Sequence, residues 1–323
     1  ALIREAVART RVRDYPDNWS SHNLLGIALR MQQRHSEAID HFLQANALAP
    51  GNDNVLFNLG NALHASGKTV DAIQTYETLL GQSPDHPKVN NNYAIALVTV
   101  GRYEQAAKHF QAQIELTPRN TDVRFNLAIA LRAMGDTTTA RKTLRDVRQI
   151  APELFAATLE LADLERSTGN HSVAQPLYEE LLGSGQLTGA AHLGLALNHL
   201  AQHDEGMASQ HLGKAIEHDI TTVEQINYLA WSLSTHPDPT ERSAAHAIFL
   251  ASFINQVTDQ QIPEIMDTLA AALAAAERFD EARSMMARAI ALLPAQSELR
   301  QPFADRLRLY ANGQMFLQEQ LTP

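Results

Sequence analysis

Asparagine side chains recur along the chain at a spacing that suits recognition of an extended peptide. Asn58, Asn92 and Asn126 follow one another at steps of 34 residues, each in a stretch with helical periodicity. A side-chain amide both donates and accepts hydrogen bonds, so a row of amides in register can hold the main chain of a peptide whatever its sequence. We therefore predict that these three side chains form a ladder that grips the main chain of a bound segment.

Other polar and charged side chains fall at neighbouring positions of the same predicted helices and complete a predicted peptide-binding groove. They are Asn61, Lys88, Arg132, Glu160 and Asp163. The middle of this groove is rich in amides, and its next section turns acidic. A peptide with an accessible main chain and a few basic residues fits such a surface best.

Histidines are concentrated in one later region of the sequence, at His192, His199, His203, His211 and His218. His199 and His203 are four residues apart, and His211 and His218 are seven apart. These spacings place both rings of a pair on one helix face, as metal ligation requires. No carboxylate–histidine motif frames them, and we interpret them as surface side chains. We expect no metal site.

The remaining residue patterns argue against catalysis and against several kinds of partner. The chain has no cysteine, and it shows no Gly-rich phosphate loop, no Gly-x-Ser-x-Gly and no paired carboxylates in a plausible cleft. Its 26 Lys and Arg against 36 Asp and Glu give a net charge of −10, which repels a phosphate backbone. No apolar run approaches the roughly 20 residues of a membrane span. We expect a non-catalytic chain with no cofactor, no nucleic-acid partner and no membrane insertion of its own.

The elements that must position these side chains repeat with the same period of 34 residues. In each unit a small residue is followed after twelve residues by an alanine, after four more by a bulky residue, and then by a closing proline. The small residues are Gly26, Gly60, Ala94, Ala128 and Ala162, and the alanines are Ala38, Ala72, Ala106, Ala140 and Ala174. The bulky residues are Phe42, Tyr76, Phe110, Leu144 and Tyr178, and the prolines are Pro50, Pro84, Pro118 and Pro152. This pattern predicts a helix, a tight turn and a second helix. The small residues let the two helices approach, the bulky residue fills the gap to the next unit, and proline ends the second helix. Glycines 67, 101 and 135 are placed to form the left-handed turns.

The joint pattern over Trp19 to Pro152 resembles the tetratricopeptide repeat. The resemblance implies an all-α fold, a right-handed superhelical solenoid of about seven to eight helix-turn-helix repeats plus a capping helix. We predict four parts: 1–16, the second helix of a truncated repeat; 17–186, regular repeats 1 to 5; 187–296, irregular repeats 6 to 8; and 297–323, a capping helix over 297–317 and a tail. In such a solenoid the first helices line the concave face, with positions 2, 5, 6, 9 and 12 of each unit facing inward.

The asparagine row occupies position 6 and resembles the asparagine ladder of the O-linked N-acetylglucosamine transferases. The alternative is that asparagine is a frequent residue at this point of the repeat and only hydrates the groove. The clamp that binds chaperone tails in this family needs several converging basic residues, and Lys88 with the distant Arg132 does not provide them. We expect a protein or peptide partner; self-association into a homo-oligomer, through the concave face or an end, is the structural alternative.

A second resemblance covers a block near the end of the chain. This block is similar to the C-terminal part of bacterial tetratricopeptide repeat proteins fused to membrane segments resembling O-mannosyltransferases. The residues that carry the similarity are Leu229 to Pro239, Arg242, Asp267 to Ala272, Arg278 to Ala282 and Arg306 to Tyr310. This resemblance implies a soluble accessory part that presents acceptor proteins, and no catalytic residue can be carried over. The chain starts without methionine inside a helical pattern, so we interpret it as a piece of a longer protein, either cytoplasmic or on the extracytoplasmic side of a bacterial membrane.

Overall fold

The computed structural model describes residues 2–86 and 88–318, and all its regular elements in these ranges are helices. The chain divides into two compact units, Ala1–Leu164 and Glu165–Pro323, and the division falls inside helix α10. The predicted division by repeat regularity, at residue 186, uses a different criterion and stays a prediction.

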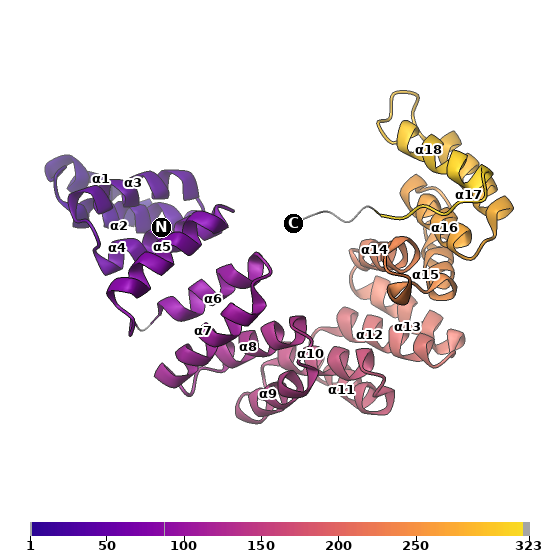
Figure 1. Cartoon of the computed structure of the whole chain (residues 1–323), viewed down its shortest axis with the longest axis horizontal. Helices are drawn as coiled ribbons and strands as arrows, with labels where there is room; N and C mark the ends of the chain where they lie inside the picture. Colours follow the sequence, from indigo (N-terminus) through magenta and orange to yellow (C-terminus); the bar gives the residue numbers. More distant parts are fainter. Residues whose placement is uncertain (1, 87, 319–323) are drawn as a thin grey trace. The chain divides into compact units, whose positions relative to one another are not determined.

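The N-terminal unit consists of one lone helix followed by helical hairpins. Its helices are α1 (Leu2–Asp14), α2 (Trp19–Arg30), α3 (His35–Leu48), α4 (Asp53–Ala65), α5 (Thr69–Gln82), α6 (Val89–Thr99), α7 (Tyr103–Leu116), α8 (Thr121–Ala133), α9 (Thr137–Ile150) and the first part of α10 (Phe155–Ser167). Helices α2 and α3, α4 and α5, α6 and α7, and α8 and α9 pack as consecutive hairpins (Figure 1). We call the side formed by α2, α4, α6 and α8 the first-helix face of this unit.

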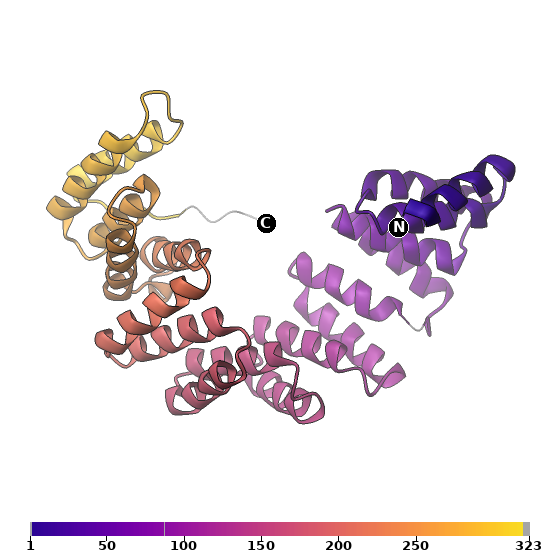
Figure 2. The same cartoon turned by 180° about the vertical axis from the view of Figure 1, so that it is seen from behind.

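The C-terminal unit repeats the same hairpin. Its helices are α11 (His171–Ser184), α12 (Thr188–Ala201), α13 (Glu205–His218), α14 (Thr222–Thr235), the short 3-10 helix η1 (Pro239–Glu241), α15 (Ala244–Val257), α16 (Pro263–Ala275), α17 (Phe279–Leu292) and α18 (Arg300–Ala311). Helices α12 and α13, α14 and α15, and α16 and α17 pair, and α18 packs on α17; Figure 2 shows these pairs from behind. The predicted all-α repeat fold is confirmed.

Small-against-large packing holds the hairpins together, as the sequence predicts. A Cβ built on Gly60 would lie 2.5 Å from a ring carbon of Tyr76, and one built on Gly26 would lie 2.6 Å from Phe42. The bulky residue therefore packs first against the small residue of its own hairpin. Tyr76 also reaches the next unit, where its ring centroid lies 6.1 Å from that of Tyr93. The side chains of Phe42 and Tyr76 are fully buried by this arrangement.

The end of the chain differs from the prediction of a helix over 297–317. Helix α18 ends at Ala311, because Gly313 adopts a left-handed conformation with φ 67° and the N–H of Gln314 turns back to the carbonyl of Leu309. Residues 312–318 then run without regular structure back to α14, where the N–H of Gln318 donates to the Thr235 carbonyl at 2.8 Å. The terminal helix is thus shorter than expected, and the segment after it lies against its own unit.

The length and hydropathy of the helices were also compared with what a bilayer requires. Within residues 2–86 and 88–318, we find no helix with both the length and the apolar character needed to cross a membrane.

Candidate functional site

The predicted asparagine row lies on the first-helix face of the N-terminal unit. Asn58 stands on α4, Asn92 on α6 and Asn126 on α8, and all three side chains are partly exposed. Each is at position 6 of its repeat unit, so each occupies the same turn of its helix. The three residues are therefore in register at the surface of this unit.

Hydrogen bonds between amides connect the neighbouring first helices. The Nδ2 of Asn58 donates to Asn23 Oδ1 of α2 at 3.0 Å, that of Asn92 to Asn61 Oδ1 of α4 at 2.7 Å, and that of Asn126 to Asn91 Oδ1 of α6 at 3.5 Å. Each residue of the predicted row thus bonds to another asparagine on the preceding first helix. Sequence reasoning placed Asn61 in the groove but did not foresee these bonds, because they depend on the distance between successive hairpins.

Asn61 accepts two hydrogen bonds in this network. Its Oδ1 accepts a second hydrogen bond, from the hydroxyl of Tyr76 at 2.7 Å. Burial raises the pKa of the Tyr76 hydroxyl, so this group stays protonated and remains a donor. The row is therefore anchored to the packing core of its own hairpin.

A hollow of about 230 Å³ opens beside this network. Its walls are Arg30, Asn61, His64, Tyr76, Asn92 and Ile95. Among the described residues, the buried Nε of Arg30 has no hydrogen-bond partner. His64 bonds to Thr99 Oγ1 at 3.2 Å, and burial lowers the pKa of its ring. Arg30 and His64 were absent from the predicted groove set, although position 12 of the inner-face rule selects both.

The other predicted groove residues are arranged less uniformly. Arg132 of α8 forms an ion pair with Glu160 of α10, so these two charges neutralise each other. Burial raises the pKa of Glu160, with Arg132 opposing this and Asp163 adding to it. Lys88, the residue just before α6, is exposed. The structure therefore links Asn61, Asn92 and Asn126 in one network through Asn91, whose Nδ2 donates to Asn92 Oδ1 at 3.1 Å. Asn58 bonds separately to Asn23, and Arg132 pairs with Glu160.

The structure corrects the interpretation of these residues as surface side chains at His192, and it leaves His203 and His218 exposed. His192 is only 7% exposed, and its Nδ1 lies 2.9 Å from His211 Nδ1. The ring of His218 stacks on that of His192 at 5.7 Å, and His199 stacks on His211 at 5.6 Å. Only His203 stands apart from this column as an exposed residue without ring contact among the described residues. The rings meet because α12 and α13 pack against each other as a hairpin, a relation between two helices that spacing along one helix does not show.

The pKa values of His192 and His211 are lowered. Burial lowers the pKa of His211 to about 4, with His192, His199 and Lys214 acting in the same direction. Burial likewise lowers the pKa of His192. Within the described ranges, no group of three or more His, Asp or Glu side chains has the geometry to hold a metal ion.

Residues of the C-terminal block converge in space. Arg306 of α18 forms two hydrogen bonds to the carboxylate of Asp267 on α16, at 2.8 and 2.6 Å. The guanidinium carbon of Arg306 lies 5.5 Å from the ring centroid of Trp231 on α14. Three helices that are far apart in the sequence thus meet at one point of the C-terminal unit.

Sequence comparison identifies the repeat. Three sequence models, each described as tetratricopeptide repeat, match the chain: one over residues 29–94, 63–108 and 97–160, a second over 1–53 and 159–205, and a third over 264–293. No curated protein matches the sequence.

Solved structures share the fold at low sequence identity. A tetratricopeptide repeat protein from Parabacteroides merdae is 21% identical, with a TM-score of 0.54 over 66% of this chain and 84% of its own. The pilF protein of Pseudomonas aeruginosa is 18% identical, with a TM-score of 0.54 over 66% of this chain and 96% of its own. MamA from Desulfovibrio magneticus is 14% identical, with a TM-score of 0.50 over 51% and 93%. These likenesses concern the fold alone. Repeated hairpins, repeat matches in both units and the shared fold show that the chain belongs to the tetratricopeptide repeat family.

Proposed function

We propose that this chain is a non-catalytic scaffold that holds an extended segment of a partner protein against the first-helix face of its N-terminal unit. Asn58, Asn92 and Asn126 would hydrogen-bond the main chain of that segment. The tetratricopeptide repeat fold is suited to protein interaction, because stacked hairpins expose a continuous row of equivalent positions.

The observation that carries this proposal is the set of amide–amide hydrogen bonds between successive first helices. Each bond uses one N–H of the donating asparagine and fixes its orientation, so less conformational entropy is lost when a ligand binds. The second N–H of each donor remains. Among the described residues, the Oδ1 atoms of Asn58 and Asn126 have no hydrogen-bond donor either. The row thus combines fixed geometry with free donors and acceptors.

The hollow beside Asn61 supports the same assignment. Arg30 lines this hollow, and a guanidinium group carries several N–H donors that can pair with a main-chain carbonyl of a bound segment.

A binding experiment with peptides selected on the intact chain tests the proposal. Peptides are chosen from a displayed random library, and their affinity is measured by calorimetry for the wild type and for the N58A/N92A/N126A variant. We expect the variant to bind at least about tenfold more weakly, because each lost hydrogen bond contributes about 1 kcal/mol.

The matched control removes three exposed amides from the second helices, in the Q74A/Q105A/Q111A variant. It should bind the selected peptides as the wild type does, since these side chains lie on α5 and α7. Equal affinities of the wild type and the asparagine variant, with both folded by circular dichroism, would eliminate the ladder.

The resemblance of the C-terminal block supports a second candidate, a soluble accessory part of a membrane-bound glycosyltransferase that presents acceptor proteins. The observation that favours it is the convergence of Trp231, Asp267 and Arg306, all from that block. The test is the reading frame upstream of Ala1. Several hydrophobic spans there would support this candidate, and a frame without them would remove it.

A further inference from the structure

A second hollow lies on the first-helix side of the C-terminal unit, between α14, α16 and α18. It has a volume of about 340 Å³ and is lined by Glu224, Asn227, Tyr228, Trp231, Glu264, Asp267, Thr268, Leu299, Phe303 and Arg306. The residues from α14 and α16 fall at positions 2, 5, 6 and 9 of their repeats, which are the inner positions of the fold. The hollow shares no residue with the asparagine network of the N-terminal unit.

The positive charge in this hollow is already neutralised. Arg306 is held by two hydrogen bonds to Asp267, and both side chains are largely buried. The guanidinium also lies over the rings of Phe303 at 5.1 Å and Phe316 at 5.2 Å. Its donors and its faces are thus engaged within the unit, and the pair adds no net charge to the hollow.

Two negative charges remain. Glu224 and Glu264 are exposed at the rim, and among the described residues neither carboxylate has a hydrogen bond or an ion pair. Beside them Tyr228 is 73% exposed, an unusual position for an aromatic ring, and the indole of Trp231 is partly exposed. The hollow therefore offers uncompensated carboxylates next to accessible aromatic surface.

We propose that this hollow binds a lysine or arginine side chain of a partner protein. A cation is attracted both to the two carboxylates and to the negative face of the exposed Tyr228 ring. An anionic side chain would be repelled by the carboxylates, and a purely apolar one would remove them from water without compensation. Arginine is favoured over lysine, because its planar guanidinium stacks on a ring while it pairs with a carboxylate.

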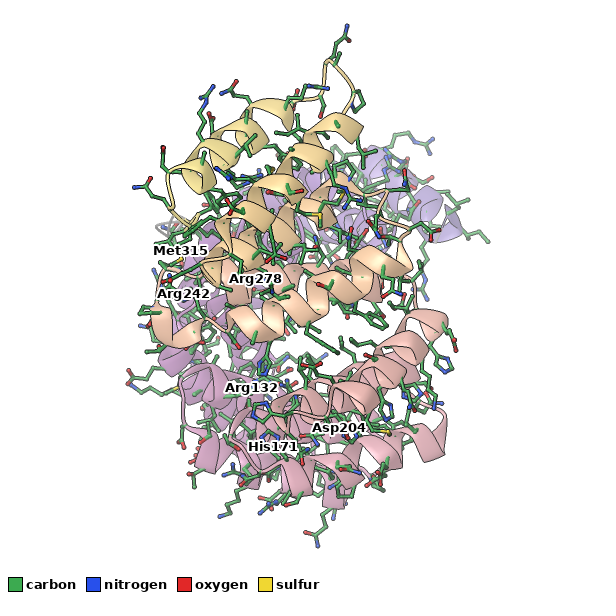
Figure 3. The ribbon with its side chains drawn as sticks, turned by 90° about the vertical axis from the view of Figure 1, so that its right-hand side faces the viewer. Arg132, His171, Asp204, Arg242, Arg278 and Met315 are labelled. Carbon is green, nitrogen blue, oxygen red and sulfur yellow. The ribbon has the colours of Figure 1, made fainter. Side chains whose placement is uncertain are left out.

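The C-terminal segment shows that an extended chain fits on this side of the unit. Main-chain N–H of Gln318 bonds to the carbonyl of Thr235 at the end of α14, and the Phe316 ring lies 5.6 Å from that of Trp231. Met315 of the same segment lies next to Arg242, with 3.9 Å between Sδ and Nη1 (Figure 3). A partner segment can therefore run beside this stretch and place one side chain in the hollow.

Tryptophan fluorescence provides a direct test. The chain has two tryptophans, so the W19F variant reports on Trp231 alone. The probes are blocked pentapeptides with arginine, lysine, citrulline or norleucine between flanking glycines. We expect saturable changes in Trp231 emission with the arginine and lysine peptides. The citrulline peptide, which keeps the shape and loses the charge, should bind at least about tenfold more weakly.

Substitutions then assign the effect to the hollow. In the W19F background, E224Q/E264Q should weaken binding of the arginine peptide at least about tenfold, and Y228A should weaken it less. The control E205Q/E217Q removes two exposed carboxylates from α13 and should leave binding unchanged. Equal binding of the arginine and citrulline peptides, or no saturable signal with a folded protein, overturns the proposal. The N58A/N92A/N126A variant should bind the arginine peptide normally, so failure of the ladder and failure of this site are distinguishable.

Discussion

The two units build the same hairpin and fill its first-helix side with different chemistry. In the N-terminal unit, neutral amides bond from one first helix to the next, as from Asn92 to Asn61. In the C-terminal unit, an ion pair between Asp267 and Arg306 joins the first helix α16 to the terminal helix α18 and is enclosed by aromatic rings. The core positions below are equivalent in both units, with a glycine against a tyrosine ring at Gly60 and at Gly194.

The difference shows that the repeat separates stability from recognition. The small and bulky residues that close the hairpin are fixed by packing, and the inner positions are left free to carry amides in one unit and charges in the other. The two kinds of linkage should respond differently to substitution, since an unpaired buried charge is far more costly than an unpaired amide.

The largest expected effect is loss of the buried carboxylate. D267A leaves the Arg306 guanidinium without its partner in a site where Arg306 is only 13% exposed, and we expect the free energy of unfolding to fall by about 3–5 kcal/mol. Urea unfolding followed by tryptophan fluorescence measures this.

The double variant D267L/R306M removes both charges and should lie within about 1 kcal/mol of the wild type, because no charge is left unpaired. If D267A and the double variant were equally stable, the ion pair would have no structural role, and the contrast with the amide network would disappear.

Packing of glycine against tyrosine should give the next largest effect, and it should be the same in both units. A Cβ on Gly60 would lie 2.5 Å from Tyr76, and one on Gly194 would lie 2.2 Å from Tyr178. We expect G60A and G194A each to destabilise the fold by about 1–3 kcal/mol through overpacking.

Two other helical glycines serve as controls, because a Cβ on Gly81 or Gly213 meets nothing within 4 Å. G81A and G213A should stabilise the chain by about 0.5–1 kcal/mol through the higher helix propensity of alanine. Thermal melts of the four variants measure these changes in stability. If G60A lowered the stability and G194A did not, the two units would not share one packing rule.

This packing could be predicted from the sequence because it depends on spacing along a single chain. The period of 34 residues identified Gly26, Phe42 and Tyr76 as partners, and it placed Asn58, Asn92 and Asn126 in register. Bonds between hairpins could not be predicted in the same way. The partners of an amide in the next hairpin depend on the distance and rotation between repeats, which the period does not fix.

The C-terminal hollow shows the same limit. The inner positions of α14 and α16 could have been selected by the rule applied to the earlier repeats, and they include Tyr228 and Asp267. Arg306 and Phe316 lie outside any repeat unit, however. Arg306 reaches this place because α18 packs on the last hairpin, and Phe316 reaches it because the chain folds back after α18. Because the sequence does not place Arg306 beside Asp267, it does not reveal that the Asp267 carboxylate is neutralised while, among the described residues, those of Glu224 and Glu264 are not.

A smaller effect is expected from Asn61 of the N-terminal unit, whose Oδ1 accepts two hydrogen bonds. N61A removes the acceptor of both Tyr76 and Asn92, and we expect a loss of about 1–2 kcal/mol in the free energy of unfolding. The exposed Asn54, also on α4, is the control, and N54A should change stability by less than about 0.5 kcal/mol. Chemical denaturation compares the two; equal stabilities would mean that water replaces the lost acceptor at no cost.

The smallest effect concerns a contact that individual hairpins make with different residues. In the first hairpin of the N-terminal unit, His22 Nδ1 lies 3.1 Å from His41 Nδ1, and other hairpins fill the same positions differently. Asn90 accepts from His109 Nδ1 at 2.8 Å in the N-terminal unit, whereas His192 faces His211 at the equivalent positions of the C-terminal unit. The pKa of His211 is lowered to about 4, below the 6.5 of an unperturbed ring. The main cause is burial; His192, His199 and Lys214 act in the same direction, and Glu179 opposes them. The rings of His199 and His218 stack on this pair. Between pH 6.5 and 4 the unfolded chain therefore binds more protons than the folded chain, and stability falls as the pH is lowered through this window.

H192N converts the histidine pair into the asparagine–histidine pair of the other unit and tests this origin of the pH dependence. With one buried titrating ring fewer, the decrease in melting temperature from pH 7 to pH 5 should be smaller than in the wild type, while stability at pH 7 changes little. Amide hydrogen exchange in α12 and α13 locates the effect, and exchange in α6 and α7, around Asn90 and His109, should be the same in both proteins. A wild-type pH profile retained in H192N would mean that protonation of this pair does not limit the stability of the C-terminal unit, and that the two contacts are equivalent in spite of their different chemistry.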